Sequence, residues 1–221
     1  MFIGHYSAAF IAAAHPKAPS LGTLFIGAQL VDFGFFSFAL LGVESMRITP
    51  GYTVMNPMDL YSMPYTHSLL GSVIWAMGFA LVIGVLSKNR AGAMIAGAVV
   101  MSHWMLDLVV HSKDLTIAGN PPKLGFGLWN YPTIEMPLEI ALTFGTLWWF
   151  VRATKASAKS WALPALIVAL LAMQAVNWFA PPPQSYDASM PISGLLAFTV
   201  ATVIAYWVAR VRSHRLKGDY R

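Results

Sequence analysis

The sequence predicts an all-α, polytopic membrane protein, a helical bundle of about seven helices, and three observations support this. Of its 221 residues, 57% are hydrophobic and only 10% are charged, whereas a soluble domain carries about 25% charged residues. The mean hydropathy is +0.60, which is more apolar than one soluble core of this size could bury. The apolar residues also form runs of about 20, the length that crosses a bilayer. We therefore expect residues 1–221 to form a single transmembrane domain.

The helices are expected between breaks made of Gly, Pro and charged residues. Their predicted ranges are 2–15, 21–43, 67–87, 91–111, 134–151, 161–179 and 190–210. The first is short and is expected to span only with help from its neighbours. It is apolar like a signal peptide, but it lacks a positive start and carries His5 inside the apolar run. We therefore expect it to be a retained helix.

Lysine and arginine are divided unevenly between the two sides of this topology. With the N-terminus outside, three of the fourteen fall on the outer side, namely Arg47, Lys113 and Lys123. The inner eleven are Lys17, Lys88, Arg90, Arg152, Lys155, Lys159, Arg210, Arg212, Arg215, Lys217 and Arg221. The positive-inside rule therefore predicts an N-out, C-in protein with a basic cytoplasmic tail. The loops 44–66, 112–133 and 180–189 are then expected outside.

Composition also excludes several functions. The chain has no cysteine, which rules out disulfides and thiolate metal ligands. The net charge of +5 is explained by the basic inner side, and no basic face with interleaved aromatic residues suggests nucleic-acid binding. The lipid bilayer is the partner that the composition predicts.

Several ionisable residues lie inside the apolar helices, where each costs about 2.5–3.5 kcal/mol, so they are candidates for function. Asp32 lies near the middle of the second helix, and His5 lies at a similar distance from the inner turn between the first two helices. The two side chains should therefore reach a similar depth. His67 begins the third helix on the outer side.

The fourth helix carries the densest group. His103, Asp107 and His111 are spaced i, i+4 and i+8, so at 100° per residue they drift by only about 40° per step and share one stripe. Asp114 returns to within about 20° of His103 if the helix continues. Glu135 and Glu139 form a further i, i+4 pair. All of these residues are expected in the outer half of the membrane.

Histidine and carboxylate ligands without cysteine suit a divalent metal, Zn²⁺ above all, with Mn²⁺ or Fe²⁺ as alternatives. Four helices contribute the predicted ligands, which are His5, Asp32, His67, His103 and Asp107. Three further residues are predicted as general base, as supports of the ligands, or as ligands of a second metal. These are His111, Asp114 and Glu139. Two structural readings stay open: helix-packing polar contacts, and ion pairs of Asp107 or Glu139 with Lys113 or Lys123.

A resemblance rests on these motifs. With Thr66-His67-Ser68 followed by His103 and Asp107, the chain resembles the bacterial inner-membrane metal-dependent hydrolases, in which an early His and an Asp on the next helix precede the same segments. Here those would be His5 and Asp32. The segment 111–115 and the Gly-Phe-Gly-Leu-Trp-Asn stretch at 125–130 resemble one subgroup, except that a phenylalanine replaces the expected leucine.

The resemblance covers about residues 1–140, so we divide the domain into a metal-site half, 1–140, and a C-terminal half, 141–221. The order of motifs is more distantly similar to the zinc phospholipase C and single-strand nuclease core. That similarity implies phosphoester hydrolysis.

The sequence thus predicts a membrane-embedded, metal-dependent hydrolase of the bacterial inner membrane. We expect a periplasm-facing site acting on an ester or phosphoester of a lipid or lipid-linked molecule. One alternative is an accessory subunit or scaffold that binds other membrane subunits through the same polar cluster. Another is a proton-coupled transporter, because His and carboxylates at depth relay protons. The sequence shows neither an inverted repeat nor paired broken helices, which disfavours the transporter.

Overall fold

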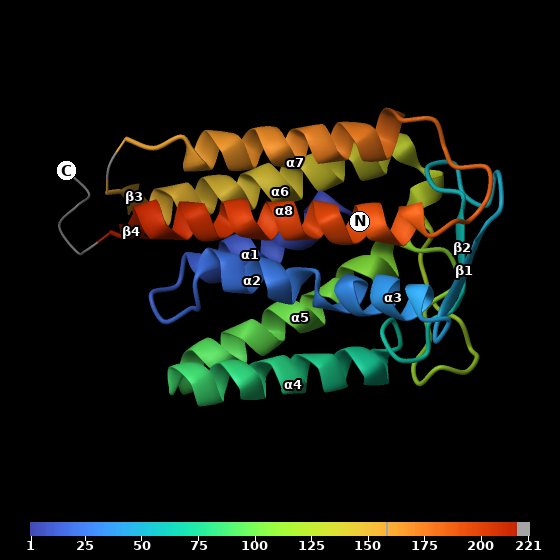
Figure 1. The fold of residues 1–221 in the computed structure, drawn as a ribbon, viewed down its shortest axis with the longest axis horizontal. Helices are drawn as coiled ribbons and strands as arrows, with labels where there is room; N and C mark the ends of the chain where they lie inside the picture. The colour runs from blue at the N-terminus through green and yellow to red at the C-terminus, as the bar shows by residue number, and fades with distance from the viewer. Residues whose placement is uncertain (158, 216–221) are drawn as a thin grey trace.

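The computed structural model describes residues 1–157 and 159–215, and these residues form a helical bundle (Figure 1). The α-helices are α1 (Tyr6–Ala13), α2 (Leu21–Ala28), α3 (Leu30–Leu40), α4 (Leu69–Ser87), α5 (Arg90–Val110), α6 (Pro132–Ala153), α7 (Ala162–Phe179) and α8 (Ser189–Val211). Short 3₁₀ turns are η1 (Ile3–His5) and η2 (Leu128–Asn130). Two two-stranded antiparallel sheets are formed, one by the hairpin of β1 (Ser45–Ile48) and β2 (Met58–Ser62) and the other by β3 (Thr154–Ala156) with β4 (Arg212–His214).

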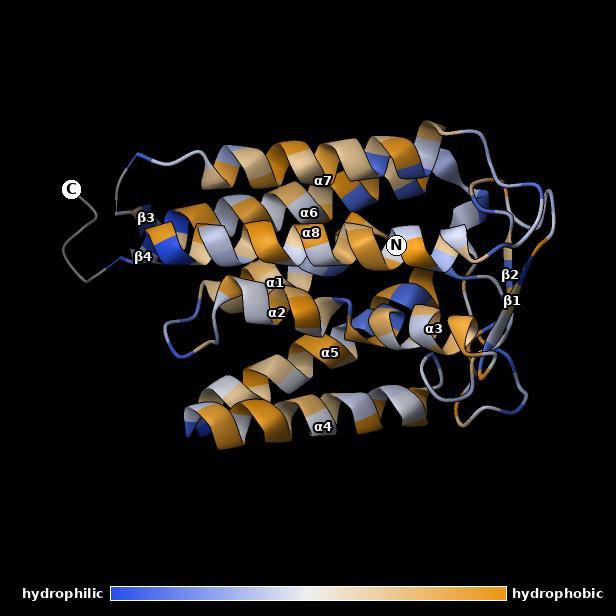
Figure 2. Ribbon diagram, viewed as in Figure 1, coloured by the Kyte–Doolittle hydropathy of each residue, from blue (hydrophilic) through white to orange (hydrophobic). Residues whose placement is uncertain are grey.

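Five helices, α4 to α8, are long and apolar enough to cross a membrane, and the bent pair α2–α3 would make a sixth span. Apolar residues run along the helices, and hydrophilic residues gather at both ends of the bundle (Figure 2). The prediction of a mainly helical membrane protein is therefore confirmed. The predicted ranges of the last five helices agree with the observed bounds to within about two residues.

The first helix is shorter than predicted and lies in the middle of the bundle. At 1.5 Å per residue, α1 is about 12 Å long, less than half the bilayer core of about 30 Å. Its rings are fully buried: Tyr6 stacks on Phe25 of α2 with centroids 4.1 Å apart, and Phe10 packs edge-on to the same ring. This helix therefore forms the core around which the longer helices pack.

The expectation of one continuous helix over 21–43 is wrong. The chain breaks between α2 and α3 with a bend of 51°, at Gln29, whose backbone has φ −111° and ψ 10°. The Gln29 side chain donates to the carbonyl of Phe2 (3.1 Å), and the carbonyl of Ala28, the last residue of α2, faces the ring of His103. Polar contacts inserted into the helical hydrogen-bond ladder are a known cause of such breaks.

Helix caps fix where α4 and α5 begin. Ser68 and Asn89 each precede a helix and accept from the third amide beyond, as N-caps do. Gly71 allows the segment 65–67 to lie against the first turn of α4, because a Cβ there would stand 2.3 Å from the carbonyl oxygen of Tyr65. This close approach places His67 directly before the N-terminal end of α4.

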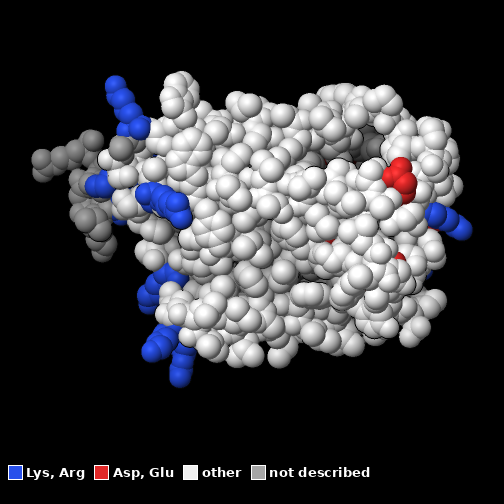
Figure 3. All heavy atoms as spheres, in the orientation of Figure 1, with Lys and Arg blue, Asp and Glu red and all other residues white. Residues whose placement is uncertain are grey.

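One end of the bundle is closed by a hairpin that the sequence did not predict. The segment 44–66, expected as a loop, contains β1 and β2, and Arg47 binds Asp59 across them (2.6 Å). At the other end, Lys and Arg side chains gather near β3 and β4 (Figure 3). Lys217 and Arg221 of the predicted basic tail lie outside the described residues. The two ends therefore differ in charge.

Candidate metal centre

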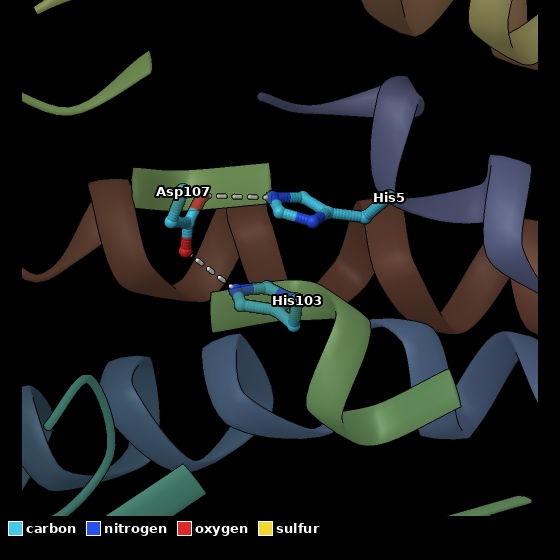
Figure 4. A group of neighbouring side chains, drawn as sticks. All are labelled: His5, His103 and Asp107. Carbon is cyan, nitrogen blue, oxygen red and sulfur yellow. Dashed lines mark ion pairs between the residues drawn. The ribbon is translucent and has the colours of Figure 1, made fainter. Parts of the chain in front are cut away.

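The side chain of Asp107 lies at the centre of the polar cluster. One carboxylate oxygen, Oδ1, is 3.1 Å from His5 Nε2 and 3.4 Å from His111 Nε2. The other, Oδ2, is 3.1 Å from His103 Nε2 and 3.6 Å from His67 Nε2. His5 and His103 approach it from η1 and α5, with their rings stacked 3.8 Å apart (Figure 4). Each oxygen of Asp107 thus faces a different pair of imidazoles.

Asp32 completes the side of the cluster that contains Oδ2. Its Oδ1 atom lies 3.3 Å from His67 Nε2 and 3.6 Å from His103 Nε2. The break at Gln29 places Asp32 in the first turn of α3, beside α5. Two groups of three possible metal donors have their ligand atoms within 4.8 Å of one another: His5 with His103 and Asp107, and Asp32 with His67 and His103.

Three of the four imidazoles are anchored through Nδ1. His103 Nδ1 lies 2.7 Å from the Ala28 carbonyl, His67 Nδ1 2.9 Å from the Thr66 hydroxyl, and His111 Nδ1 2.9 Å from Asp114 Oδ1. A carbonyl and a carboxylate can only accept, so Nδ1 of His103 and of His111 carries the proton. A neutral imidazole protonated at Nδ1 presents a lone pair at Nε2. Metal-binding histidines are oriented in this way.

In the neutral form of His103 and His111 these lone pairs face carboxylate oxygens, which are also acceptors, so either a second proton on the ring or a metal ion must lie between them. Nε2 of His5 and of His103, together with Oδ2 of Asp107, are buried without a hydrogen-bond partner. Two ligands about 2.1 Å from one Zn²⁺ at the tetrahedral angle lie about 3.4 Å apart, close to the separations of 3.1–3.6 Å around the cluster. The donor set therefore fits a divalent cation.

Two of the additional predicted residues lie together beside the cluster. His111 is the C-cap of α5, and Asp114 holds its ring from the loop beyond. Burial alone would lower the pKa of His111, but the carboxylates of Asp107 and Asp114 raise it to about 9. His111 thus presents Nε2 to Asp107, while Asp114 supports the ring from behind.

Glu139, the third additional residue, binds the backbone rather than an imidazole. Its Oε1 accepts from the amides of Phe2 and Gly4, and its Oε2 accepts from Gln174 Nε2 of α7 (2.8 Å). The side-chain oxygen of the same residue, Gln174 Oε1, in turn accepts from the backbone amide of Ile3 (3.3 Å). Glu139 therefore holds the turn η1, from which His5 extends toward Asp107.

The ion pairs weighed as a structural alternative do not occur in the part of the chain that the structure describes. Lys123 donates to the backbone carbonyl of Tyr61 (3.0 Å), and neither Lys113 nor Lys123 pairs with Asp107 or Glu139. The cluster instead joins the carboxylates to imidazoles and to the N-terminal ammonium of Met1, which lies 3.5 Å from Asp107 Oδ1.

Sequence reasoning missed a carboxylate that supports His67. Glu44 is 1% exposed, and its Oε1 accepts from the amides of Tyr65 and Thr66. Its Oε2 accepts from the Thr66 hydroxyl (2.6 Å). The hydroxyl proton is thus directed to Glu44, which leaves the Thr66 oxygen to accept from His67 Nδ1. The Thr-His motif was visible in the sequence, whereas the pairing with Glu44, 22 residues away, was not.

A carboxylate that the sequence marked but to which no site role was assigned faces a cavity. Glu135 is 1% exposed, and its Oε2 has no hydrogen-bond partner. It lines a cavity of about 1200 Å³, together with Asp32, His67, Asp107 and His111. The i, i+4 spacing of Glu135 and Glu139 was visible in the sequence, whereas the different surroundings of the two side chains were not.

The hydroxyl of Thr66 gives a direct test of the support behind His67. Thr66→Val should keep the shape of the side chain but remove the link between Glu44 and His67, and loss of such support typically weakens metal binding about 10- to 100-fold. Competition for Zn²⁺ with a chromogenic chelator would measure this change. Thr146→Val is the matched control, because that hydroxyl bonds only within α6. Equal affinities of the two variants would contradict the role assigned to Thr66.

No model of a known protein family matches the chain, and neither a curated protein nor a solved structure matches it.

Proposed function

We propose that this chain is a membrane-embedded, metal-dependent hydrolase that cleaves an ester or phosphoester. One observation carries the proposal: four buried imidazoles converge on the carboxylates of Asp107 and Asp32, and one of them, His103, is anchored through Nδ1 and has an Nε2 atom without a hydrogen-bond partner. Without a metal, protonated imidazoles and the N-terminal ammonium of Met1, 3.5 Å from Asp107 Oδ1, would have to neutralise these buried carboxylates. The spacing of the donor atoms also matches the ligands of a divalent metal. The resemblance to the inner-membrane metal-dependent hydrolases points the same way.

The residues divide into two ligand sets that share Asp107. One would consist of Asp32, His67, His103 and Oδ2 of Asp107, and the other of His5, His111 and Oδ1 of Asp107. Zinc suits these donors, as would manganese or iron. A bound divalent ion would lower the pKa of water and polarise a carbonyl or phosphoryl oxygen.

The remaining polar residues have distinct roles in this proposal. Asp114, Thr66 and the Ala28 carbonyl hold the imidazoles in their productive tautomers. Glu139 positions His5 through the backbone of η1. Glu135, whose Oε2 is free on the cavity wall, is the carboxylate that would accept a proton from the attacking water.

We place the site on the periplasmic side of a bacterial inner membrane. Asp107 lies three residues from the end of α5 and Glu135 three residues from the start of α6, both at the end that carries β1 and β2. Most Lys and Arg residues gather at the opposite end (Figure 3), which the positive-inside rule assigns to the cytoplasm.

The bend at Gln29 is the one feature that would favour the transporter. Transporters place substrate sites at broken helices that recur in both halves of the fold. Here α2–α3 is the single bent pair within residues 1–157 and 159–215, and its freed carbonyl is bonded to His103. The break therefore supplies a hydrogen-bond acceptor to the polar cluster, and the hydrolase remains the better-supported proposal.

Metal content tests this proposal. The purified protein should retain at least one equivalent of Zn, Mn or Fe by elemental mass spectrometry and should hydrolyse p-nitrophenyl phosphate. His103→Ala should lose most of the metal and the activity, while His214→Ala, at the other end of the molecule on β4, should keep both. A protein that takes up no metal, or a His103→Ala variant with wild-type content, would contradict the proposal.

A further inference from the structure

The cavity beside the cluster is larger than a small polar substrate requires. Its volume is about 1200 Å³, whereas sites for small molecules occupy about 300–1,000 Å³. Polar residues of the cluster line part of it, and α3, α6, α7 and α8 supply much of the remaining wall. The surface is visibly hollowed on this face, toward the end of the molecule opposite the concentration of Lys and Arg (Figure 3).

The wall away from the cluster is apolar. It includes Phe36, Met173, Val176 and Phe198, and the rings of Phe36 and Phe198 stack with centroids 5.8 Å apart. The described residues that line the cavity include no Lys or Arg. An anionic group would therefore be held by cations bound at the cluster, and the remaining space suits hydrocarbon.

The cavity extends to the depth of the hydrocarbon core. On α7 its lining reaches Ala172, seven residues before the helix ends at Phe179, and on α8 it reaches Phe198, nine residues after the start at Ser189. At 1.5 Å per residue, these positions lie about 10 and 14 Å inside the helix ends. Hydrocarbon chains of the surrounding bilayer occupy the same depth.

The end of the cavity nearest the aqueous phase is covered. The loop between β1 and β2 contributes residues 50–51 and 53–57 to the lining, and it is fixed to η2. The amide of Val54 donates to Asn130 Oδ1 (3.4 Å), and the amide of Met55 donates to the Trp129 carbonyl (3.1 Å). The connection 178–184 between α7 and α8 lines the cavity as well. This cover favours entry of the substrate from the bilayer.

We infer that the substrate is a membrane phospholipid, whose hydrocarbon chain lies between α3, α7 and α8 and whose phosphoester lies at the cluster. This inference rests on the proposed hydrolase function. In the reaction, the oxygen of water bonds to phosphorus, the bond from phosphorus to the alcohol oxygen breaks, and the alcohol leaves with a proton. The lipid products remain in the cavity or return to the bilayer.

Lipid binding tests the inference without hydrolysis. Native mass spectrometry of Zn²⁺-loaded protein, reconstituted with a non-hydrolysable phosphonate analogue of dioleoylphosphatidylglycerol and returned to detergent, should show one retained lipid. Ala172→Trp and Ala197→Trp place a large ring in the cavity and should each reduce the retained fraction at least tenfold. Ala175→Trp is the matched control, because Ala175 is exposed on the same helix but does not line the cavity. Retention by the cavity variants at the control level would overturn the inference.

Hydrolysis by the metal-loaded protein separates this inference from the function on which it rests. Ala172→Trp should lower phospholipid hydrolysis at least tenfold and leave kcat/KM for p-nitrophenyl phosphate within about twofold. Equal losses on both substrates, or loss on neither, would count against the lipid site but not against the hydrolase. If the metal-loaded protein hydrolyses neither substrate while the binding results hold, the hydrolase proposal fails and the lipid cavity stands.

Discussion

Asp107→Asn should lower the bound metal to less than a tenth of the wild-type content and abolish hydrolysis. Both oxygens of Asp107 lie within 3.6 Å of imidazole Nε2 atoms, so this one carboxylate would contribute to both ligand sets. Asparagine keeps the shape but removes the charge, and its amide nitrogen is a donor that cannot bind a cation. Elemental analysis of the purified variant would measure the loss.

The control for this prediction is Asp187→Asn, since Asp187 is exposed on the connection between α7 and α8. That variant should bind metal and hydrolyse p-nitrophenyl phosphate like the wild type. If Asp107→Asn kept its metal and lost only activity, Asp107 would be a base rather than a ligand. If it kept both, the centre would have to lie elsewhere.

Glu139→Ala should lower the free energy of unfolding by about 3 kcal/mol or more. The substitution leaves the amides of Phe2 and Gly4 and the Gln174 side chain without an acceptor, and each buried donor left unpaired costs about 1–3 kcal/mol. Because η1 carries His5, the affinity for Zn²⁺ should also fall. Reversible unfolding in mixed micelles and chelator competition would measure the two effects.

Glu135→Ala provides the contrast one helical turn away. Its Oε2 has no hydrogen-bond partner to lose. The stability of this variant should therefore equal or exceed that of the wild type, while hydrolysis of p-nitrophenyl phosphate should fall. Equal stability losses in the two variants would show that Glu139 has no special part in holding the N-terminal turn.

Sequence periodicity was sufficient to predict the membrane-spanning helices and the row of polar side chains on one face of α5. The i, i+4 and i+8 spacing of His103, Asp107 and His111 requires only helical geometry, and the structure places all three at one cluster. The depth argument also brought His5 and Asp32 to the same place. The ligand candidates were thus predictable because each depends on local helix geometry and on membrane depth.

The supports of these ligands were not predictable, because they depend on contacts between distant segments. Glu44 meets Thr66 across 22 residues, and Glu139 meets Gly4 across 135. The bend at Gln29 was missed for a related reason: no proline marks it, and the contacts that stabilise it come from Phe2 and His103. The polar residues could be recognised as unusual from the sequence, but their hydrogen-bond partners could be identified only in the folded structure.

The carbonyl of Ala28 has a consequence for genetic analysis of this protein. It fixes the tautomer of His103, yet it belongs to the backbone, so a substitution at position 28 does not remove it. An alanine scan would pass over the position, since it is already alanine, and homologues could differ there freely while keeping the same interaction. A substitution or insertion that straightened the chain at Gln29 would, by contrast, withdraw the acceptor and inactivate the centre with every ligand still present.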